Sequence, residues 1–252
     1  MQVDTASGAW NDIEAIGRAI KAAGHPALFM VDAVASLACM PFEMDAWGID
    51  VAMSGSQKGL MAPPGLGFVA ASDRAREAHR TANLRTPYWD WTARDGTEHY
   101  SKHSGTAPVH LLFAQRQAID MLLDEGLPNV FRRHALLAEA VRRAVAAWSE
   151  GGVLGFNIQA PAERANTVTT VTMAVPAPLL AYCKNNCGVI LGVGIGDLSG
   201  RAFRIAHMGH INAPMILGTL GVIEMGLQAL GIPHGKGGVT TAIEYLGDSV
   251  GA

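Results

Sequence analysis

The stretch that decides the fold is Ile49-Asp-Val-Ala-Met-Ser-Gly-Ser-Gln-Lys-Gly59. Its first part, from Ile49 to Ser54, is a short apolar run, which predicts a buried β-strand. The Gly-Ser-Gln-Lys sequence that follows predicts a turn, and residues 65–71 predict another strand beyond it. The turn therefore presents Lys58 just past the carboxyl end of a buried strand.

A second strand, upstream of this stretch, ends in an acid. The apolar run 27–31 is typical of a parallel strand that is covered on both faces, and it stops at Asp32. Before it, residues 11–23 have helical apolar spacing and are followed by a Gly and a Pro, which predicts a helix. Helices that alternate with buried strands predict an α/β fold, in which ligands bind outside the carboxyl ends of the strands. Asp32 and Lys58 are therefore expected in one pocket.

Composition and charge exclude several classes of protein. The chain has 252 residues, of which 49% are hydrophobic and 16% charged, and this predicts a compact domain, with or without a smaller second one. A net charge of -3 with both signs interspersed does not favour nucleic-acid binding, so small molecules and protein are the expected partners. The cysteines lack zinc-type spacing and favour a reducing cytoplasm. No apolar run reaches the roughly 18 residues that span a bilayer, and the N-terminus does not resemble a signal peptide, so no membrane association is expected.

Three short segments resemble a known family when they are taken together. Alone, an acid after a strand usually caps the next helix, and a lysine in a Gly-Ser loop is usually a solvated surface charge. Together, Asp32-Ala-Val-Ala-Ser36, Ser54-Gly-Ser-Gln-Lys58-Gly and Ala62-Pro-Pro-Gly65 resemble the class V aminotransferases of fold type I, in particular the alanine-, serine- and aspartate-glyoxylate enzymes. The resemblance starts at Asp4-Thr-Ala-Ser-Gly8 and extends to Phe203-Arg-Ile205.

The resemblance implies an α/β fold, the pyridoxal-phosphate-dependent transferase fold type I. Residues 1–125 are then a partial large cofactor-binding domain with a mixed, mostly parallel sheet and the start of a connecting helix, and residues 126–252 are a small C-terminal α+β domain. The implied activity is transfer of an amino group from alanine, serine or aspartate to glyoxylate or pyruvate through pyridoxal 5'-phosphate. A lyase or desulfurase of the same fold is disfavoured, because the latter needs a mobile cysteine and none lies in an obvious loop.

The resemblance also implies roles for the residues around the cofactor. Lys58 forms the internal Schiff base and then moves a proton between the substrate and the cofactor. Asp32 lies under the pyridine nitrogen and keeps it protonated, and Val34 packs against the ring face. The remaining expected contacts are Ser56 and Gln57 near the phosphate and Thr5 at the phenolic oxygen.

Arg204 alternates with two apolar neighbours, Phe203 and Ile205, which predicts a strand that buries them on one face and turns Arg204 to the other. A surface arginine on an edge strand is the ordinary interpretation. The resemblance instead implies that the planar guanidinium binds the substrate carboxylate with two parallel hydrogen bonds. The preceding stretch, 192–196, lacks the glycine spacing of a dinucleotide site and is predicted to be a loop.

A second subunit is expected to complete the site. In the family, a Tyr and a Thr from the neighbouring subunit contact the phosphate, and the corresponding stretch here is His103-Ser-Gly-Thr106. His103 stands at the Tyr position and Thr106 is retained, so the resemblance implies a homodimer. His99 with His103, and His207 with His210, have metal-ligand spacing, but no acid or cysteine completes either pair, so no metal site is expected.

The rest of the chain predicts long helices and a small sheet. Repeated apolar spacing predicts a helix from Val109, a turn at Gly126-Leu-Pro128 and a second helix over 130–148. Residues 167–175 alternate in the manner of a half-buried strand. Helices are also predicted over residues 178–185 and, with a buried character, 213–230.

The resemblance further implies that the family sequence begins before the point that matches Met1. That preceding part supplies a glycine-rich turn and a helix N-terminus that bind the phosphate, and an aromatic ring that stacks on the cofactor. We therefore expect that a separate chain supplies this part, or that the 252-residue chain is a catalytically incomplete fragment or an interaction subunit of such an enzyme.

Overall fold

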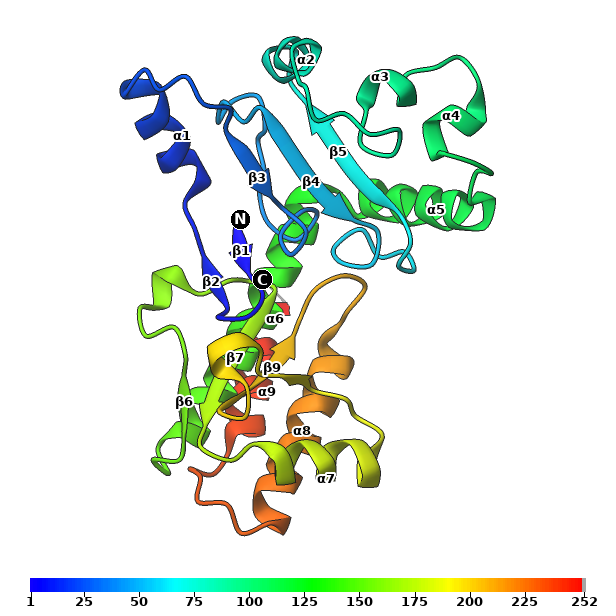
Figure 1. Cartoon of the computed structure of the whole chain (residues 1–252). Coiled ribbons are helices and arrows are strands. Elements are labelled where there is room, and N and C mark those ends of the chain that lie inside the picture. The colour runs from blue at the N-terminus through cyan, green and yellow to red at the C-terminus, as the bar shows by residue number, and fades with distance from the viewer. Residues whose placement is uncertain (251–252) are drawn as a thin grey trace.

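The lysine-bearing stretch forms the middle strand of a three-stranded sheet. In the computed structural model, which describes residues 1–250, this sheet has the order β3-β4-β5 (Figure 1). β3 (Met30–Asp32) runs parallel to β4 (Val51–Gly55), and β5 (Gly67–Ala71) runs antiparallel to β4. The sheet of this unit is therefore mixed.

The first predicted elements are confirmed, with shifted ends. The strand predicted over 27–31 starts too early, because ladder pairing begins only at Met30. The helix predicted over 11–23 is α1 (Ile13–Ala22). It begins at Asp12, whose side chain accepts a hydrogen bond from the Ala15 N–H at 2.9 Å and so satisfies one of the free donors at the helix start.

The described residues cover only one face of this sheet. Val31 and Ala52 are buried in a cluster with the first residue of α1. On the other face, Met30, Met53 and Val69 are 59%, 41% and 56% exposed. The expectation of a strand covered on both faces is therefore wrong for residues 1–250, because these three side chains of the second face remain open to solvent.

Short helices lead away from β5. α2 (Asp73–Arg80) begins at Ser72, whose hydroxyl accepts from the Ala75 N–H. α3 (Trp91–Arg94) and α4 (His99–His103) follow. Figure 1 shows these helices beyond β5, at the opposite end of the molecule from the four-stranded unit described below.

Two long helices connect the units. α5 (Val109–Glu125) and α6 (Leu127–Ser149) meet at Gly126, whose φ of +81° is a conformation that glycine adopts at little cost. The predicted turn is confirmed, and Pro128 lies in the first turn of α6, where a missing N–H breaks no helical hydrogen bond. The break at Gly126 falls at the predicted limit between domains 1–125 and 126–252, and these domain limits stay a prediction.

The second unit is a four-stranded antiparallel sheet with the order β6-β7-β9-β8. Its strands are β6 (Leu154–Phe156), β7 (Val168–Met173), β8 (Gly192–Val193) and β9 (Ala202–Ala206). The helices that follow α6 are α7 (Ala177–Cys187), α8 (Ala213–Ala229) and α9 (Gly238–Val250), with 3-10 turns at Pro161–Glu163 and Gly196–Leu198. The main core cluster lies between this sheet and the helices and includes the fully buried Trp148, Phe203 and Leu220. The helices predicted in this region are confirmed. Within the described residues, no helix combines the length and apolar character needed to cross a membrane.

Two predictions about this sheet are wrong. β7 was expected to be half-buried but is buried along nearly its whole length, because β6 and β9 flank it and the N-terminal segment lies across it. There the Thr170 hydroxyl donates to the Ala6 carbonyl at 3.0 Å. Gly192 and Val193, expected to lie in a loop, form β8 by pairing with β9. A strand of two residues is too short to produce a periodic pattern.

An N-terminal hairpin joins the two units. Its strands are β1 (Val3–Asp4) and β2 (Ala9–Trp10), which pair in antiparallel fashion. The Gln2 N–H donates to the Asp32 carbonyl in β3 at 2.9 Å. The Ala165 N–H donates to the Gly8 carbonyl, also at 2.9 Å. The hairpin is thus hydrogen-bonded to the three-stranded unit at one end and to the four-stranded unit at the other.

His207 follows β9 and gives the fold a pH-dependent stability. It is fully buried, with Nε2 at 2.9 Å from Thr169 Oγ1 and Nδ1 at 3.0 Å from the Asn166 carbonyl. Burial lowers the pKa of His207 from 6.5 to about 3, so the folded chain keeps the imidazole neutral. Below pH 6.5 the unfolded chain takes up a proton that the folded chain does not. The free energy of unfolding is therefore expected to fall by up to about 1.4 kcal/mol per pH unit as the pH drops below that value.

Urea denaturation at pH values on both sides of 6.5 measures this dependence. His207→Gln is expected to reduce the slope by about one proton, because the titrating group is gone. His110→Gln is the matched control, since His110 is exposed on α5, and it should leave the slope unchanged. Equal slopes for His207→Gln and the unaltered chain would show that the buried imidazole does not control the pH dependence.

Candidate active site

Lys58 lies in a tight turn that Ser56 closes. The fully buried Ser56 hydroxyl donates to the Pro63 carbonyl at 2.6 Å and accepts from the Leu66 N–H at 3.2 Å. The Met61 N–H donates to the Lys58 carbonyl at 3.0 Å, and the turn leaves Lys58 half-buried. The Ser56 side chain therefore holds the shape of the turn, and its contact with a phosphate stays a prediction.

Close packing beneath the turn requires glycine at position 59. A Cβ there would lie 2.7 Å from Cys39 Sγ and would collide with the Leu37 carbonyl. From the other side, Gln115 of α5 donates through Nε2 to the Leu60 carbonyl at 3.2 Å. The turn is therefore held between α5 and the segment that follows β3.

Asp32 is the last residue of β3 and lies opposite Met53 of β4 in the parallel register. Its Oδ1 accepts a hydrogen bond from the Val34 N–H at 2.8 Å, which restrains the carboxylate. Because the two strands are parallel, both end at one edge of the sheet, and β4 leads directly into the Lys58 turn. The structure places Asp32 and Lys58 at the same edge, as expected. The contacts of Asp32 and Val34 with a cofactor stay predictions.

Arg204 reaches from the small sheet to the N-terminal hairpin. β9 buries Phe203 and Ile205 on one side while Arg204 lies on the other, which confirms the predicted alternation. Arg204 Nη1 donates to the Thr5 carbonyl and Nε to the Val193 carbonyl, each at 2.8 Å. β9 lies between β7 and β8, so Arg204 is not an arginine on an edge strand. The fold thus brings Thr5 and Arg204 together from opposite ends of the chain.

Asp4 is a charged neighbour of Arg204 that the sequence analysis missed. Its carboxylate accepts from the Ser7 hydroxyl at 2.6 Å and from the Ala6 N–H at 2.9 Å. Burial acts to raise the pKa of Asp4, but these hydrogen bonds and the Arg204 charge together hold it below its ordinary value. An Asp followed by a Ser three residues later is the sequence signal for such a turn. Asp4 therefore stabilises the hairpin turn and remains an anion next to Arg204.

Three of the predicted contacts are exposed. Gln57 lies beside Lys58 within the turn. His103 ends α4 and Thr106 follows it, and Figure 1 shows α4 set apart from the end of β4 that leads to Lys58. The structure does not bring His103 and Thr106 next to the Lys58 of their own chain. Their contact with a cofactor stays a prediction that requires a neighbouring subunit.

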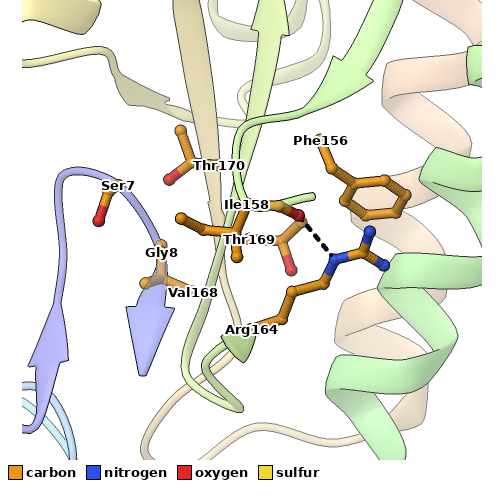
Figure 2. A pocket seen from close by; sticks show the side chains of 8 residues that line it. All are labelled: Ser7, Gly8, Phe156, Ile158, Arg164, Val168, Thr169 and Thr170. Carbon is orange, nitrogen blue, oxygen red and sulfur yellow. Dashed lines mark hydrogen bonds between the residues drawn. The ribbon is translucent and has the colours of Figure 1, made fainter. Parts of the chain in front are cut away.

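A small cavity lies between the N-terminal hairpin and β7 (Figure 2). Its volume is about 10 Å³, close to the minimum for one water molecule, so it is too small for an amino acid. Arg164 borders it, donating through Nε to the Ile158 carbonyl at 2.9 Å, with the guanidinium 3.7 Å from the Phe156 ring centre. This region packs the hairpin against the sheet, whereas Asp32 and the Lys58 turn lie at the edge formed by β3 and β4.

Known proteins resemble this chain in sequence and in fold. The family model described as Aminotransferase class-V matches residues 1–195. The chain belongs to the class-V aminotransferases. It is 37% identical over 254 residues to the serine-glyoxylate aminotransferase of Methylorubrum extorquens and 37% identical over 257 residues to the L-aspartate-glyoxylate aminotransferase of Paracoccus denitrificans. The alignments cover 96% and 99% of this chain but 62% and 63% of these relatives, so the chain spans less than two thirds of their length.

Solved structures of two aminotransferases have the same fold. The ureidoglycine-glyoxylate aminotransferase of Bacillus subtilis matches with a TM-score of 0.86 at 25% identity, covering 97% of this chain and 63% of that one. The pyridoxamine-pyruvate aminotransferase of Mesorhizobium loti matches with a TM-score of 0.85 at 28% identity, covering 98% and 63%. The predicted fold type I, with a partial large sheet and a small α+β unit, is confirmed, as is the family resemblance on which it depended.

Pyridoxal phosphate is the cofactor of the class-V aminotransferases, and the residues present here fit it. The Lys58 amine, the Asp32 carboxylate and the Arg204 guanidinium are groups of the chemical kinds that the cofactor aldehyde, its pyridine nitrogen and a substrate carboxylate would require, and their contacts with these groups stay predictions. Across residues 1–250 there is no group of three His, Cys, Asp or Glu side chains placed to hold a metal ion.

Removal of the Arg204 guanidinium is expected to loosen the N-terminal hairpin. Arg204→Met loses the charged hydrogen bonds to Thr5 and Val193, so the free energy of unfolding should fall by roughly 1 to 3 kcal/mol. Urea denaturation measures the loss, and hydrogen exchange of residues 4–8 shows where it occurs. Arg201→Met is the control, because Arg201 is exposed and its side chain donates to the Asp197 carbonyl within the same turn. Equal effects of the two substitutions would contradict an anchoring role for Arg204.

Proposed function

We propose that this chain is the lysine-bearing part of an aminotransferase that moves an amino group from alanine, serine or aspartate to glyoxylate or pyruvate. The observation that carries the proposal is the parallel pairing of β3 with β4, which puts Asp32 and the Lys58 turn at one edge of the sheet. The names of two relatives give serine and aspartate as donors and glyoxylate as acceptor, which supports the choice of substrates.

Lys58 and Asp32 have separate tasks in the proposed reaction. Pyridoxal phosphate, when bound, supplies an electron sink for the bonds at the substrate α-carbon. The Lys58 amine would hold the cofactor and, once released from it, would move the proton at the substrate α-carbon. The Asp32 carboxylate would keep a proton on the pyridine nitrogen, and its hydrogen bond from the Val34 N–H limits its rotation. Val34 would pack its branched side chain against the ring.

Arg204 binds the substrate carboxylate in this proposal. Its bonds to Thr5 and Val193 use Nε and one N–H of Nη1, and the rest of the guanidinium N–H groups remain for a carboxylate. The same two bonds hold the planar fork in one orientation, which reduces the entropy lost when a substrate binds. Specificity for a carboxylate therefore follows from a side chain that the fold already restrains.

The remaining cofactor contacts come from two subunits. Ser56 and Gln57 are proposed to lie near the phosphate, and Thr5 near the phenolic oxygen. His103 and Thr106 are proposed to reach the phosphate of a neighbouring copy, which makes the enzyme a homodimer. The surface around α3, α4 and α5 exposes Leu84, Trp89 and Phe113, and an exposed apolar surface of this kind supports a protein partner. The free thiols of all three cysteines support a cytoplasmic location.

The proposed enzyme needs more sequence than these 252 residues. The chain spans 62% of the Methylorubrum relative, and its sheet is open at Met30, Met53 and Val69. We infer that a segment equivalent to the rest of the relatives covers this face and completes the phosphate site, either in a longer polypeptide or as a separate chain. The partial coverage of the relatives and the open sheet face also fit the alternative function, in which this chain is a catalytically incomplete fragment or an interaction subunit of such an enzyme.

Incubation with pyridoxal phosphate followed by reduction with borohydride is expected to label Lys58, because its amine reacts with the aldehyde. Peptide mapping by mass spectrometry locates the label. Lys58→Arg should abolish it, whereas Lys21→Arg, on the exposed side of α1, should leave it unchanged. A label on Lys102 or Lys184, with Lys58 unmodified, would refute the assignment of Lys58 as the cofactor-binding lysine.

Cofactor retention tests whether the chain needs a completing segment. The isolated chain is expected to lose pyridoxal phosphate on dialysis and to transaminate little, because the expected phosphate-binding helix N-terminus lies outside it. Fusion to the remaining part of the Methylorubrum relative should restore retention, measured by absorbance after dialysis. If the isolated chain retains the cofactor and converts alanine and glyoxylate at an ordinary rate of about 1 to 1000 per second, the need for a completing segment is refuted.

A further inference from the structure

The Lys58 turn touches the loop that follows Arg204. This loop leaves β9 at residue 207, and its Gly209 packs against the turn, where an added Cβ would lie 3.1 Å from the Lys58 carbonyl. Gly209 also has a φ of +86°, which other residues rarely adopt. Position 209 therefore combines a backbone conformation and a close contact that both require glycine.

Two side chains of α6 hold Gly209 in place. The Gly209 N–H donates to His134 Nε2 at 3.1 Å, and its carbonyl accepts from Arg133 Nη1 at 3.0 Å. His134 is fully buried, and its Nδ1 lies 2.7 Å from the Val130 carbonyl. Because Nε2 accepts from an N–H, the imidazole is neutral with its proton on Nδ1, and burial lowers the pKa of His134 in the direction that favours this form. Arg133 is itself restrained by Glu125, whose two carboxylate oxygens lie 2.7 and 2.9 Å from Nε and Nη2.

The same two helices also contact the turn directly. Leu60 and Met61, which follow Lys58, pack against the buried Leu122 of α5 and Val130 of α6. The Lys58 turn is therefore enclosed on its backbone side by α5, by α6 and by the Gly209 loop. The contacts described above are made by the backbone of the turn and by Leu60 and Met61, so they act on Lys58 through the position of its amine.

We propose that Gly209, held by His134 and Arg133, is a positioning residue that sets the place of Lys58 relative to Arg204. Arg204 and Gly209 belong to one continuous stretch of backbone, β9 and the loop after it, whereas Lys58 belongs to the three-stranded unit. The contact at Gly209 therefore fixes the position of the Lys58 turn relative to β9, the strand that carries Arg204. This inference rests on the proposed function of Lys58, and it assigns to Gly209 the task of positioning that lysine.

Two glycine substitutions distinguish the effect of the contact between Gly209 and Lys58 from the effect of backbone strain at a positive φ. Gly209→Ala adds a methyl group next to the Lys58 carbonyl, while the control Gly237→Ala changes a glycine with a similar φ of +82° whose added Cβ would meet only Thr240, at 4.0 Å. The readout is the fraction of Lys58 labelled by pyridoxal phosphate and borohydride in a fixed time. Gly209→Ala is expected to lower it by about fivefold, the effect of losing one well-placed interaction, and Gly237→Ala to leave it essentially unchanged.

Two substitutions of His134, in α6, test whether the hydrogen bond from the Gly209 N–H positions the Lys58 turn. His134→Gln places Oε1 near the position of Nε2, so it keeps an acceptor for the Gly209 N–H. His134→Asn places its amide N–H near the position of Nδ1, so it keeps the donor to Val130 but does not reach Gly209. Urea denaturation measures the stability that each variant loses. Labelling of Lys58 is expected to stay near the original level in His134→Gln and to fall by about fivefold in His134→Asn.

The possible outcomes are distinct. Equal labelling in the two glycine variants, or in the two His134 variants, overturns the positioning role and leaves the role of Lys58 intact. Labelling that falls in all four variants in proportion to lost stability also overturns it, because the contact is then structural only. Absence of label on Lys58 in the unaltered chain refutes the proposed function, and the positioning role with it.

Discussion

The parallel pairing of β3 with β4 is the constraint on which the rest of the structure depends. The register joins Met30 to Val51 and Asp32 to Met53, so the two strands end at the same edge. A slip of one residue would move every side chain of the strand to the opposite face, and the buried Val31 and Ala52 prevent such a slip. The chain leaves this edge twice, once after Asp32 and once into the Lys58 turn, and so the chemistry of the proposed site follows from backbone hydrogen bonding.

Beyond that edge, three loops meet, and close approach of their backbones depends on two glycines. Gly59 faces Cys39 and the Leu37 carbonyl, and Gly209 faces the Lys58 carbonyl. Two polar side chains buried at this junction have partners, as a medium of low polarity favours: Ser56 bonds within its own turn, and His134 bonds to Gly209 and Val130. The result is a turn that is packed on its backbone side while the Lys58 side chain stays half-buried. Such an arrangement suits a residue that must react at its tip and be held at its base.

Arg204 connects this junction to the N-terminal hairpin. Its bond to Thr5 joins the four-stranded sheet to the hairpin, its bond to Val193 lies within that sheet, and Asp4 places a negative charge close by. The Arg204 guanidinium therefore anchors the hairpin, and it is also proposed to bind the substrate carboxylate. The anchoring bonds hold it in the orientation that carboxylate binding needs. The open sheet face at Met30, Met53 and Val69 shows the opposite condition, an apolar surface that the described residues do not cover. The greater length of the class-V relatives and this open face are consistent with a site that is completed by further polypeptide.

The sequence by itself determined many of the helices and strands, among them α1, α5, α6, β4 and β7, together with the two groups that meet at the sheet edge and the family, because apolar periodicity and turn chemistry are local properties that a short segment carries. It did not determine the burial of β7, the pairing of the two-residue β8 or the open face of β3, since burial depends on which other segments lie above a strand. Only the tertiary structure decided the partners of the polar groups. Arg204 binds Thr5, 199 residues away in the sequence, and His134 binds Gly209, 75 residues away. Local sequence patterns do not predict pairs that lie so far apart in the chain. Lys58 and Asp32 are recognisable in the sequence, but the contacts that place them exist only once the chain has folded.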